Sequence, residues 1–166
     1  MDYHKDRFED YSLMVYKNEK LIALLPANKK DNIVYSHQGL SYGGVVYMKE
    51  VKFKDSLEVF ESILKFLKKS GHQQLYLNPI PQFYNTKLSE EFSYFLFILE
   101  AKLRRRDTLS VIRYSDGLSL SKSRKEGVSR AHKQGLEIKE VAEFSEFWND
   151  ILIPNLKFKH KTKPVH

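Results

Sequence analysis

The first part of the chain alternates short apolar runs with polar breaks, which is the pattern of β-strands. Residues 11–16 alternate weakly, and after a polar break of two residues an unbroken apolar run follows at 21–25. Two such runs around a short polar break predict a β-hairpin. Residues 32–36 and 44–47 contain valine, isoleucine and tyrosine and predict two further strand segments.

Later segments repeat apolar residues at the spacing of an α-helix. Asp55 followed by Glu58 predicts a capping box at the start of a helix that ends at Gly71. Ser89 is expected to cap a second helix that buries Phe92, Phe95, Leu96 and Leu99. Residues 120–134 predict a third, basic helix.

Strand segments are expected between these helices, at residues 74–77, 108–114 and 136–141. Residues 144–152 form a last helical face, which Pro154 is expected to interrupt. The predicted fold class is α/β (α+β), with a mixed, mainly antiparallel sheet flanked by helices. Because no repeat or linker divides the 166 residues, a single domain is expected over residues 1–166.

The positive net charge of the chain predicts an anionic partner. Lysine and arginine together number 28, aspartate and glutamate 21, and the net charge is +7. Many of the basic residues are gathered at 104–106, 121–135 and 157–163. Such an excess favours nucleic acid, a nucleotide-linked substrate, coenzyme A or an acidic membrane face.

Several kinds of site and location are excluded by what the sequence lacks. With no cysteine, the chain has no disulfide, zinc ribbon or cysteine nucleophile, and a reducing compartment is favoured. No apolar run approaches the roughly 18 residues of a membrane span, so we expect a cytoplasmic protein without one. The six histidines do not have metal-ligand spacing, and no metal site is predicted.

The segment 36–44 is the most unusual in the chain, because it contains three glycines and two polar aromatic side chains between predicted strands. Such a loop can present backbone N–H groups to an anion or let a substrate approach the backbone closely. The alternative is a β-bulge or wide turn in which His37 and Tyr42 satisfy only local hydrogen bonds.

The basic helix carries an arginine on its apolar side. At 100° per residue, Arg124 falls on the same stripe as Leu120, Gly127, Val128 and Ala131. A guanidinium that points inward needs an acid, carbonyl groups or a ligand phosphate, because burying it unpaired costs several kcal/mol. Both an internal ion pair and a phosphate site remain open.

Residues 124–129 nearly match R/Q-x-x-G-x-G/A, the pattern with which acetyl-CoA-dependent enzymes hold pyrophosphate at a helix start. In such enzymes the loop leads into the helix that corresponds to the one predicted near Asp55. Residues 49–54 contain no glycine, so the pattern stands in the wrong place.

Five segments together resemble the N-terminal half of bacterial GNAT-family N-acyltransferases related to FemAB. In order they are MDYHKDRFEDYSLMVY, KLIALLPAN, YSHQGLSYGG, SRKEGVSRAHKQGL and KPVH. The resemblance implies a GNAT-like sheet that lacks its first strand. It also implies an incomplete enzyme, because relatives have a further strand and helix before this region and a second GNAT-like half after it.

The resemblance implies a transfer from acyl-CoA (acetyl-CoA) or aminoacyl-tRNA to an amine of a cell-envelope sugar or peptide precursor. This half is expected to bind the acceptor, an anionic nucleotide-linked or phosphate-containing substrate, and no donor is expected on this chain alone. The implied acceptor cleft is lined by His37, Gln38, Tyr42, Gly43 and Gly44, with Arg124 and Arg130 as phosphate partners. No catalytic base is implied.

Two other functions remain open, a basic nucleic-acid-binding module and an inactive remnant of the GNAT fold. The first would use the basic residues on helix faces, which bind nucleic acid without a specific site. A half-enzyme is also expected to leave apolar surface uncovered, and such surface favours a homo-oligomer.

Overall fold

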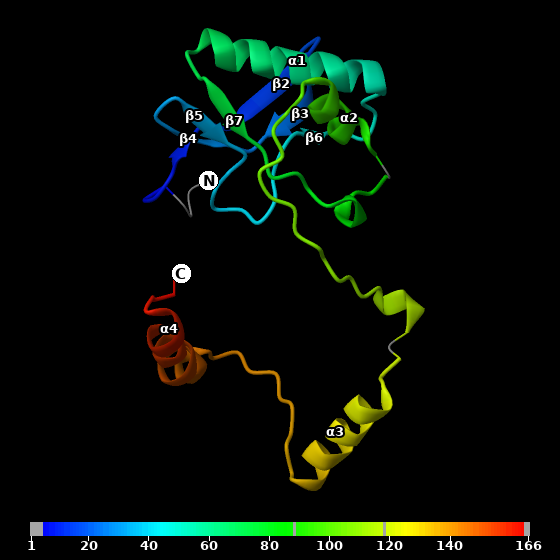
Figure 1. The fold of residues 1–166 in the computed structure, drawn as a ribbon, viewed down its shortest axis with the longest axis vertical. Helices are drawn as coiled ribbons and strands as arrows, with labels where there is room; N and C mark the ends of the chain where they lie inside the picture. Colours follow the sequence, from blue (N-terminus) through cyan, green and yellow to red (C-terminus); the bar gives the residue numbers. More distant parts are fainter. Residues whose placement is uncertain (1–4, 88, 118, 165–166) are drawn as a thin grey trace. The chain divides into compact units, whose positions relative to one another are not determined.

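The computed structural model describes residues 5–87, 89–117 and 119–164. The chain divides into two compact units, Met1–Arg106 and Asp107–His166. The first unit contains two small β-sheets with helices α1 and α2, and the second contains helices α3 and α4 (Figure 1). The fold is therefore mixed α/β, as the sequence predicts, and the single domain stays a prediction.

The predicted N-terminal hairpin is confirmed. Strands β2 (Leu13–Lys17) and β3 (Lys20–Leu25) pair antiparallel, and β6 (Val46–Tyr47) pairs with the other side of β3. The turn residues Asn18 and Glu19 both have a positive φ, of 50° and 63°. Two central residues in the left-handed region suit the twist of a two-residue hairpin, which explains why the polar break is so short.

The second sheet has the strand order β1-β4-β5-β7. Its strands are β1 (Glu9–Asp10), β4 (Asn28–Lys30), β5 (Ile33–Tyr35) and β7 (Gln74–Tyr76). The pairs β1–β4 and β4–β5 are antiparallel, whereas β5–β7 is parallel. The sheet is thus mixed and mainly antiparallel. Strand β4 was not predicted, because its three residues are polar.

The pairs β1–β4 and β2–β3 follow one another along the same two chain segments but belong to different sheets, and one proline explains the division. Pro26 lies between β3 and β4 and has no N–H to give to a strand ladder. At this point the Ala27 N–H donates to the Ser12 hydroxyl at 3.2 Å, and the Tyr11 N–H donates to the Ala27 carbonyl at 2.9 Å. The chain bends there and passes from one sheet to the other.

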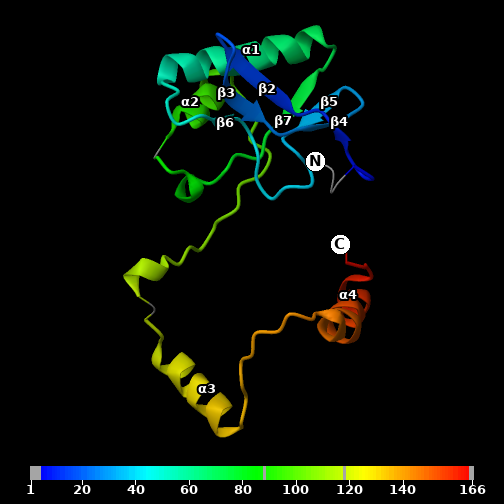
Figure 2. The ribbon, with the colours of Figure 1, turned by 180° about the vertical axis from the view of Figure 1, so that it is seen from behind.

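Helix α1 (Phe53–Lys69) covers one face of the strands in the first unit (Figures 1 and 2). Its apolar stripe packs into the largest buried cluster, whose members are Ala23, Leu25, Ala27, Val34, Val59, Ile63 and Leu67. Burying one such aliphatic side chain stabilises a fold by about 1.5–3 kcal/mol. This contact is the main apolar core of the unit.

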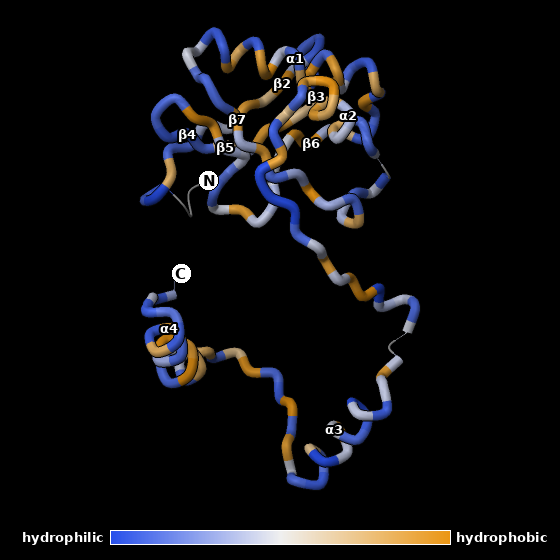
Figure 3. Tube along the Cα trace, viewed as in Figure 1, coloured by the Kyte–Doolittle hydropathy of each residue, from blue (hydrophilic) through white to orange (hydrophobic). Residues whose placement is uncertain are grey.

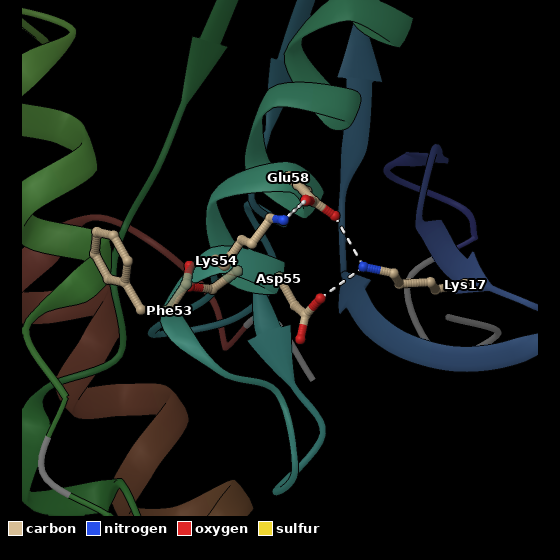
Figure 4. A network of polar contacts seen from close by, with 6 residues as sticks. Lys17, Phe53, Lys54, Asp55 and Glu58 are labelled. Atoms are coloured by element: carbon tan, nitrogen blue, oxygen red, sulfur yellow. Dashed lines mark hydrogen bonds and ion pairs between the residues drawn. The ribbon is translucent and has the colours of Figure 1, made fainter.

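The predicted capping box is wrong, because the N-cap of α1 is Lys52, three residues before Asp55. Asp55 therefore lies inside the first turn. Its carboxylate and that of Glu58 accept hydrogen bonds from the Lys17 ammonium at the end of β2, at 2.7 and 2.9 Å (Figure 4). The Lys17 ammonium lowers the pKa of Asp55, and the two carboxylates raise the pKa of Lys17.

Helix α2 (Glu91–Ile98) follows a short 3₁₀ turn and packs through Phe95. Phe95 is fully buried and stacks on Phe60 of α1 with ring centroids 6.0 Å apart. The helix is confirmed, but Ser89 is not its cap. The N-cap is Glu90, and the Ser89 hydroxyl bonds to the carboxylate of the first helical residue. Of the four apolar side chains expected inside, only Phe95 is buried.

In the second unit, α3 (Lys122–Lys133) confirms the predicted basic helix and is mainly hydrophilic along its length (Figure 3). The predicted strands at 108–114 and 136–141 are wrong. Both segments lack strand structure, and no described strand pairs with either. An alternating pattern becomes a strand only where a partner takes its backbone hydrogen bonds.

Pro154 does not interrupt the last helix, contrary to expectation. A π-helical segment (Phe147–Leu152) runs directly into α4 (Ile153–His160), and Pro154 lies in the first turn of α4. Proline is tolerated at the first positions of an α-helix, where the backbone N–H has no partner within that helix.

We expect the core contact of α1 to dominate the stability of the first unit. Replacing Ile63, whose exposure is 2%, by alanine should lower the free energy of unfolding by about 2–5 kcal/mol. The matched change Phe66→Ala, at a position 48% exposed on the same helix, should cost about 0.5 kcal/mol. Urea denaturation measures both. Equal losses would contradict this account of the core.

The Lys17 contact should show its own dependence on pH and salt. The pKa of Asp55 is lowered in the folded protein. The stability that Asp55 contributes is therefore present at pH values above its ordinary pKa of 3.8 and is lost in more acid solution. Because the pKa of Lys17 is raised, its share is present below 10.5 and is lost at higher pH. Lys17→Gln should therefore lower Tm most near neutral pH, and less in about 1 M salt.

The matched control is Lys20→Gln, which removes the same charge from the other strand of the hairpin. Thermal unfolding followed by circular dichroism measures both variants. If Lys17→Gln lowers Tm equally at pH 2 and pH 7, the contribution of Lys17 to stability does not come from its ion pairs with Asp55 and Glu58.

Candidate functional site

The loop at 36–44 is fixed by a buried side chain, that of Asn28. Asn28 is 1% exposed, and its side-chain Oδ1 accepts the backbone N–H of Gln38 at 2.8 Å. Its amide nitrogen donates to the Gln38 side-chain oxygen at 3.0 Å. In the segment KLIALLPAN, Leu25 and Ala27 are fully buried, so they place Asn28 at this point. Asn28 was not predicted as a site residue, although this segment carries part of the resemblance.

The loop uses most of its N–H groups within the protein. Besides Gln38, Gly39 donates to Nδ1 of His37 at 3.1 Å and Leu40 donates to the His37 carbonyl at 3.0 Å. Gly43 donates to the Asn78 carbonyl at 2.7 Å. These four groups are not available to an anion. At these four positions the backbone does not form an open cradle of N–H groups.

Gly43 and Gly44 are required by the fold. Both are buried, and a Cβ at Gly43 would lie 2.2 Å from the Ser36 carbonyl oxygen. Gly44 has a φ of 94°, which favours glycine, and a Cβ there would contact the Phe92 ring at 3.6 Å. Close approach of the backbone therefore explains both glycines. Their role in an acceptor cleft stays a prediction.

Ser36 and Asn78 join the loop to the end of β7. The Ser36 N–H donates to the Tyr76 carbonyl at 2.8 Å, and the Ser36 hydroxyl accepts the Asn78 N–H at 2.9 Å. The Asn78 side-chain amide donates to the Ser41 carbonyl. Both ends of the loop are thus held on the sheet, so the loop has a defined position.

Beside this loop, the sheet has a polar and aromatic face. Asn28, Tyr35 and Tyr76 lie opposite one another on three neighbouring strands. Their sequence neighbours Val34 and Leu75 belong to or pack against the core under α1. Because side chains alternate along a strand, Tyr35 and Tyr76 point to the face away from α1.

Tyr35, Tyr76 and Arg104 form a stack on this face, which we call the tyrosine–arginine stack. The two rings are nearly parallel, with centroids 5.2 Å apart and an interplanar angle of 11°. The Arg104 guanidinium lies 4.9 Å from the centroid of the Tyr76 ring. Both rings are half-buried and Arg104 is exposed. A cation beside aromatic faces is suited to flat or phosphorylated ligands.

His37 was expected in the acceptor cleft but is only 2% exposed. Its φ is 56°, in the left-handed region, and its ring meets Phe8 edge-on at 5.7 Å between centroids. Since Nδ1 accepts the Gly39 N–H, this nitrogen carries no proton. In this position His37 shapes the loop from inside and does not present its ring to solvent.

Gln38 and Tyr42 are the expected loop residues that have exposed surface. Gln38 is exposed, and Tyr42 is half-buried with its ring 5.9 Å from that of Tyr84. Together with the tyrosine–arginine stack, they form the candidate site of the first unit. Tyr35, Tyr76 and Arg104 were not predicted as site residues. The arginine run at 104–106 was the only sign of them in the sequence.

Arg124 and Arg130 lie in the second unit, on α3, and both are exposed. The expectation that Arg124 is buried or paired inside is wrong. Its apolar stripe is not covered, since none of the described residues of α3 is buried and Val128 is 49% exposed. A phosphate-binding role for these two arginines stays a prediction.

Comparison with protein-family models, with curated proteins and with solved structures found no match. In the part of the chain that the structure describes, no helix combines the length and the apolar character needed to cross a membrane. The same residues contain no group of three or more histidine, aspartate or glutamate side chains placed to hold a metal ion.

The close contact at Gly43 gives a test of the loop. Gly43→Ala should destabilise the first unit by about 1–3 kcal/mol, because the new methyl group meets the Ser36 backbone. Gly127→Ala is the matched control, since a Cβ there meets nothing within 4 Å and alanine favours the helix by up to about 1 kcal/mol. Urea denaturation measures both changes. A neutral Gly43→Ala would show that the loop backbone moves freely.

Proposed function

We propose that this chain is the acceptor-binding part of a FemAB-related N-acyltransferase of the GNAT family. The enzyme would move an acyl or aminoacyl group from acyl-CoA or aminoacyl-tRNA to an amine of a cell-envelope sugar or peptide precursor. One observation carries the proposal. The loop YSHQGLSYGG, which with LLPAN is a specific part of the resemblance, is anchored beside the half-exposed tyrosine–arginine stack.

The chemistry of this surface suits an anionic, nucleotide-linked acceptor. Tyr35 and Tyr76 stack on each other and Arg104 lies over the Tyr76 ring, so the exposed parts of the two rings would contact a flat ring or sugar while the Arg104 guanidinium pairs with phosphate oxygens. Gln38 adds an exposed amide that is hydrogen-bonded to Asn28, the cross-strand neighbour of Tyr35. Holding the acceptor in one orientation is the main contribution that a binding half makes to catalysis.

In the proposed reaction, the amine nitrogen of the acceptor attacks the carbonyl carbon of the donor. A C–N bond forms, the C–S bond of a thioester or the C–O bond of an ester breaks, and the leaving thiolate or alkoxide takes up a proton. The amine nitrogen loses one proton in the same sequence. We assign no residue of this chain to its removal.

The N-terminus of α1 supports acceptor binding over donor binding. The segment 48–52 that leads into α1 contains no glycine, and Asp55 and Glu58 place two carboxylates in its first turns. The Lys17 ammonium is already bound to both (Figure 4). Negative charge at a helix start disfavours the pyrophosphate of coenzyme A. The donor is therefore expected to bind outside this helix end.

The second candidate function is nucleic-acid binding, which the exposed basic face of α3 favours. Lys122, Lys125, Arg130 and Lys133 fall within one side of this helix and all four are exposed. Such a face binds phosphates without sequence preference, and its affinity falls steeply with salt. A strong salt dependence distinguishes it from the acceptor site.

We expect the chain to bind a nucleotide-diphosphate-linked amino sugar and not to bind acetyl-CoA at micromolar concentration. Arg104→Gln and Tyr76→Ala should each weaken acceptor binding about tenfold, which corresponds to roughly 1.4 kcal/mol. The matched control Tyr16→Ala removes a tyrosine that is 56% exposed on the other sheet and should leave the affinity unchanged. Isothermal titration calorimetry measures all of these.

Two results would contradict the proposal. Micromolar affinity for acetyl-CoA would place the donor on this chain. Equal affinity of wild type and Arg104→Gln for the acceptor would remove the tyrosine–arginine stack from the site. Circular dichroism of Tyr76→Ala separates loss of binding from loss of the fold.

A further inference from the structure

Strand β7 forms one edge of the second sheet. It is the last strand in the order β1-β4-β5-β7, and its Tyr76 carbonyl accepts the Ser36 N–H beyond β5. Because backbone groups alternate in direction along a strand, the N–H and C=O of Leu75 point away from β5, to the outer edge. An edge of this kind pairs readily with another extended chain.

A groove of about 570 Å³ adjoins this edge. One wall is the C-terminal half of α1 and the other is the beginning of β7, into which the chain turns after α1 (Figure 1). Its apolar lining consists of Leu64, Leu67 and Leu75, and its polar lining of Lys68, Gly71, His72, Gln73 and Gln74. A strand that pairs with Leu75 would turn alternate side chains toward these leucines.

The charge around the groove selects among possible occupants. Lys68 lines the groove, and Lys69 follows it in the last turn of α1; both are exposed. With a net charge of +7, a second copy of this chain would bring further positive charge to this place. A partner that is negatively charged avoids that repulsion and gains an ion pair.

We propose that the outer edge of β7 and this groove bind an acidic, extended peptide as an added β-strand. Its backbone pairs with the N–H and C=O of Leu75, its apolar side chains at alternate positions contact Leu64 and Leu67, and an acidic group pairs with Lys68. Backbone pairing supplies the affinity in this mode of recognition, and the side chains supply the specificity. The proposal does not depend on acyl transfer.

The probe for this site is the N-acetylated hexapeptide Val-Thr-Val-Thr-Glu-Thr, labelled for fluorescence anisotropy and called the valine–glutamate peptide. Its two valines and its glutamate share one face of an extended strand, the face that would be turned to α1. It should bind the full chain, and Lys68→Glu should weaken it at least tenfold. The control variant Lys20→Glu makes the same charge change at an exposed position in the hairpin and should leave binding unchanged. The same peptide with lysine in place of its glutamate should bind wild type weakly and the Lys68→Glu variant more tightly. Equal binding of both peptides to wild type would overturn the proposal.

Backbone pairing is tested without changing the protein. Two versions of the valine–glutamate peptide are N-methylated at alternate residues, one set on each edge of the peptide strand. Methyl groups on the edge that faces β7 should abolish binding, and methyl groups on the other edge should not. If both versions bind alike, the peptide does not pair with β7 and the proposal fails.

Amide hydrogen exchange of the free protein tests whether the edge is open. The Leu75 amide should exchange rapidly in the free chain and become protected when the valine–glutamate peptide is added. Protection that is present without peptide and independent of concentration would mean that the chain covers its own edge. Protection that grows with protein concentration would mean that a second copy covers it. Either result overturns the proposal.

Discussion

The packing of α1 on one face of the strands is the contact on which the rest of the first unit depends. It buries Val59, Ile63 and Leu67 against Val34 and the residues around it. Side chains alternate along a strand, so burying one set turns the neighbouring set to the other face. The hydrophobic contact under α1 therefore also places the tyrosine–arginine stack on the open face. A register shift of one residue in β5 would exchange core and candidate site.

Polar contacts then fix two parts that the hydrophobic core does not hold, the loop at 36–44 and the turn end of the hairpin. The buried Asn28 holds Gln38, and Ser36 and Asn78 hold the two ends of the same loop. At the other end of α1's stripe, the Lys17 ammonium joins the hairpin to Asp55 and Glu58. Buried hydrogen bonds are costly to leave unmade, so a satisfied amide such as Asn28 defines one loop position. A ligand site on this face would therefore lie beside a loop whose position is fixed.

The sequence predicted elements well where one local signal was strong. The hairpin around Asn18 and Glu19, the helix ending before Gly71 and the basic helix all follow from short-range patterns. The sequence did not predict β4, because a strand of polar residues has no hydrophobic periodicity to detect. It also failed for 108–114, which has the period of a strand and no described partner. A local pattern shows that a segment can adopt the strand conformation. The strand forms only where a neighbouring strand takes its backbone hydrogen bonds.

For the candidate site, the sequence by itself determined which loop is unusual, because three glycines near His37 and Tyr42 stand out in any context. Only the tertiary structure decided which of these residues have exposed surface. His37, Gly43 and Gly44 are buried, whereas Gln38 is exposed and hydrogen-bonded to Asn28 of β4. Tyr35 and Tyr76 are far apart in the chain and meet because β5 and β7 pair in parallel. Exposure and stacking depend on long-range packing, which residue order along the chain does not record.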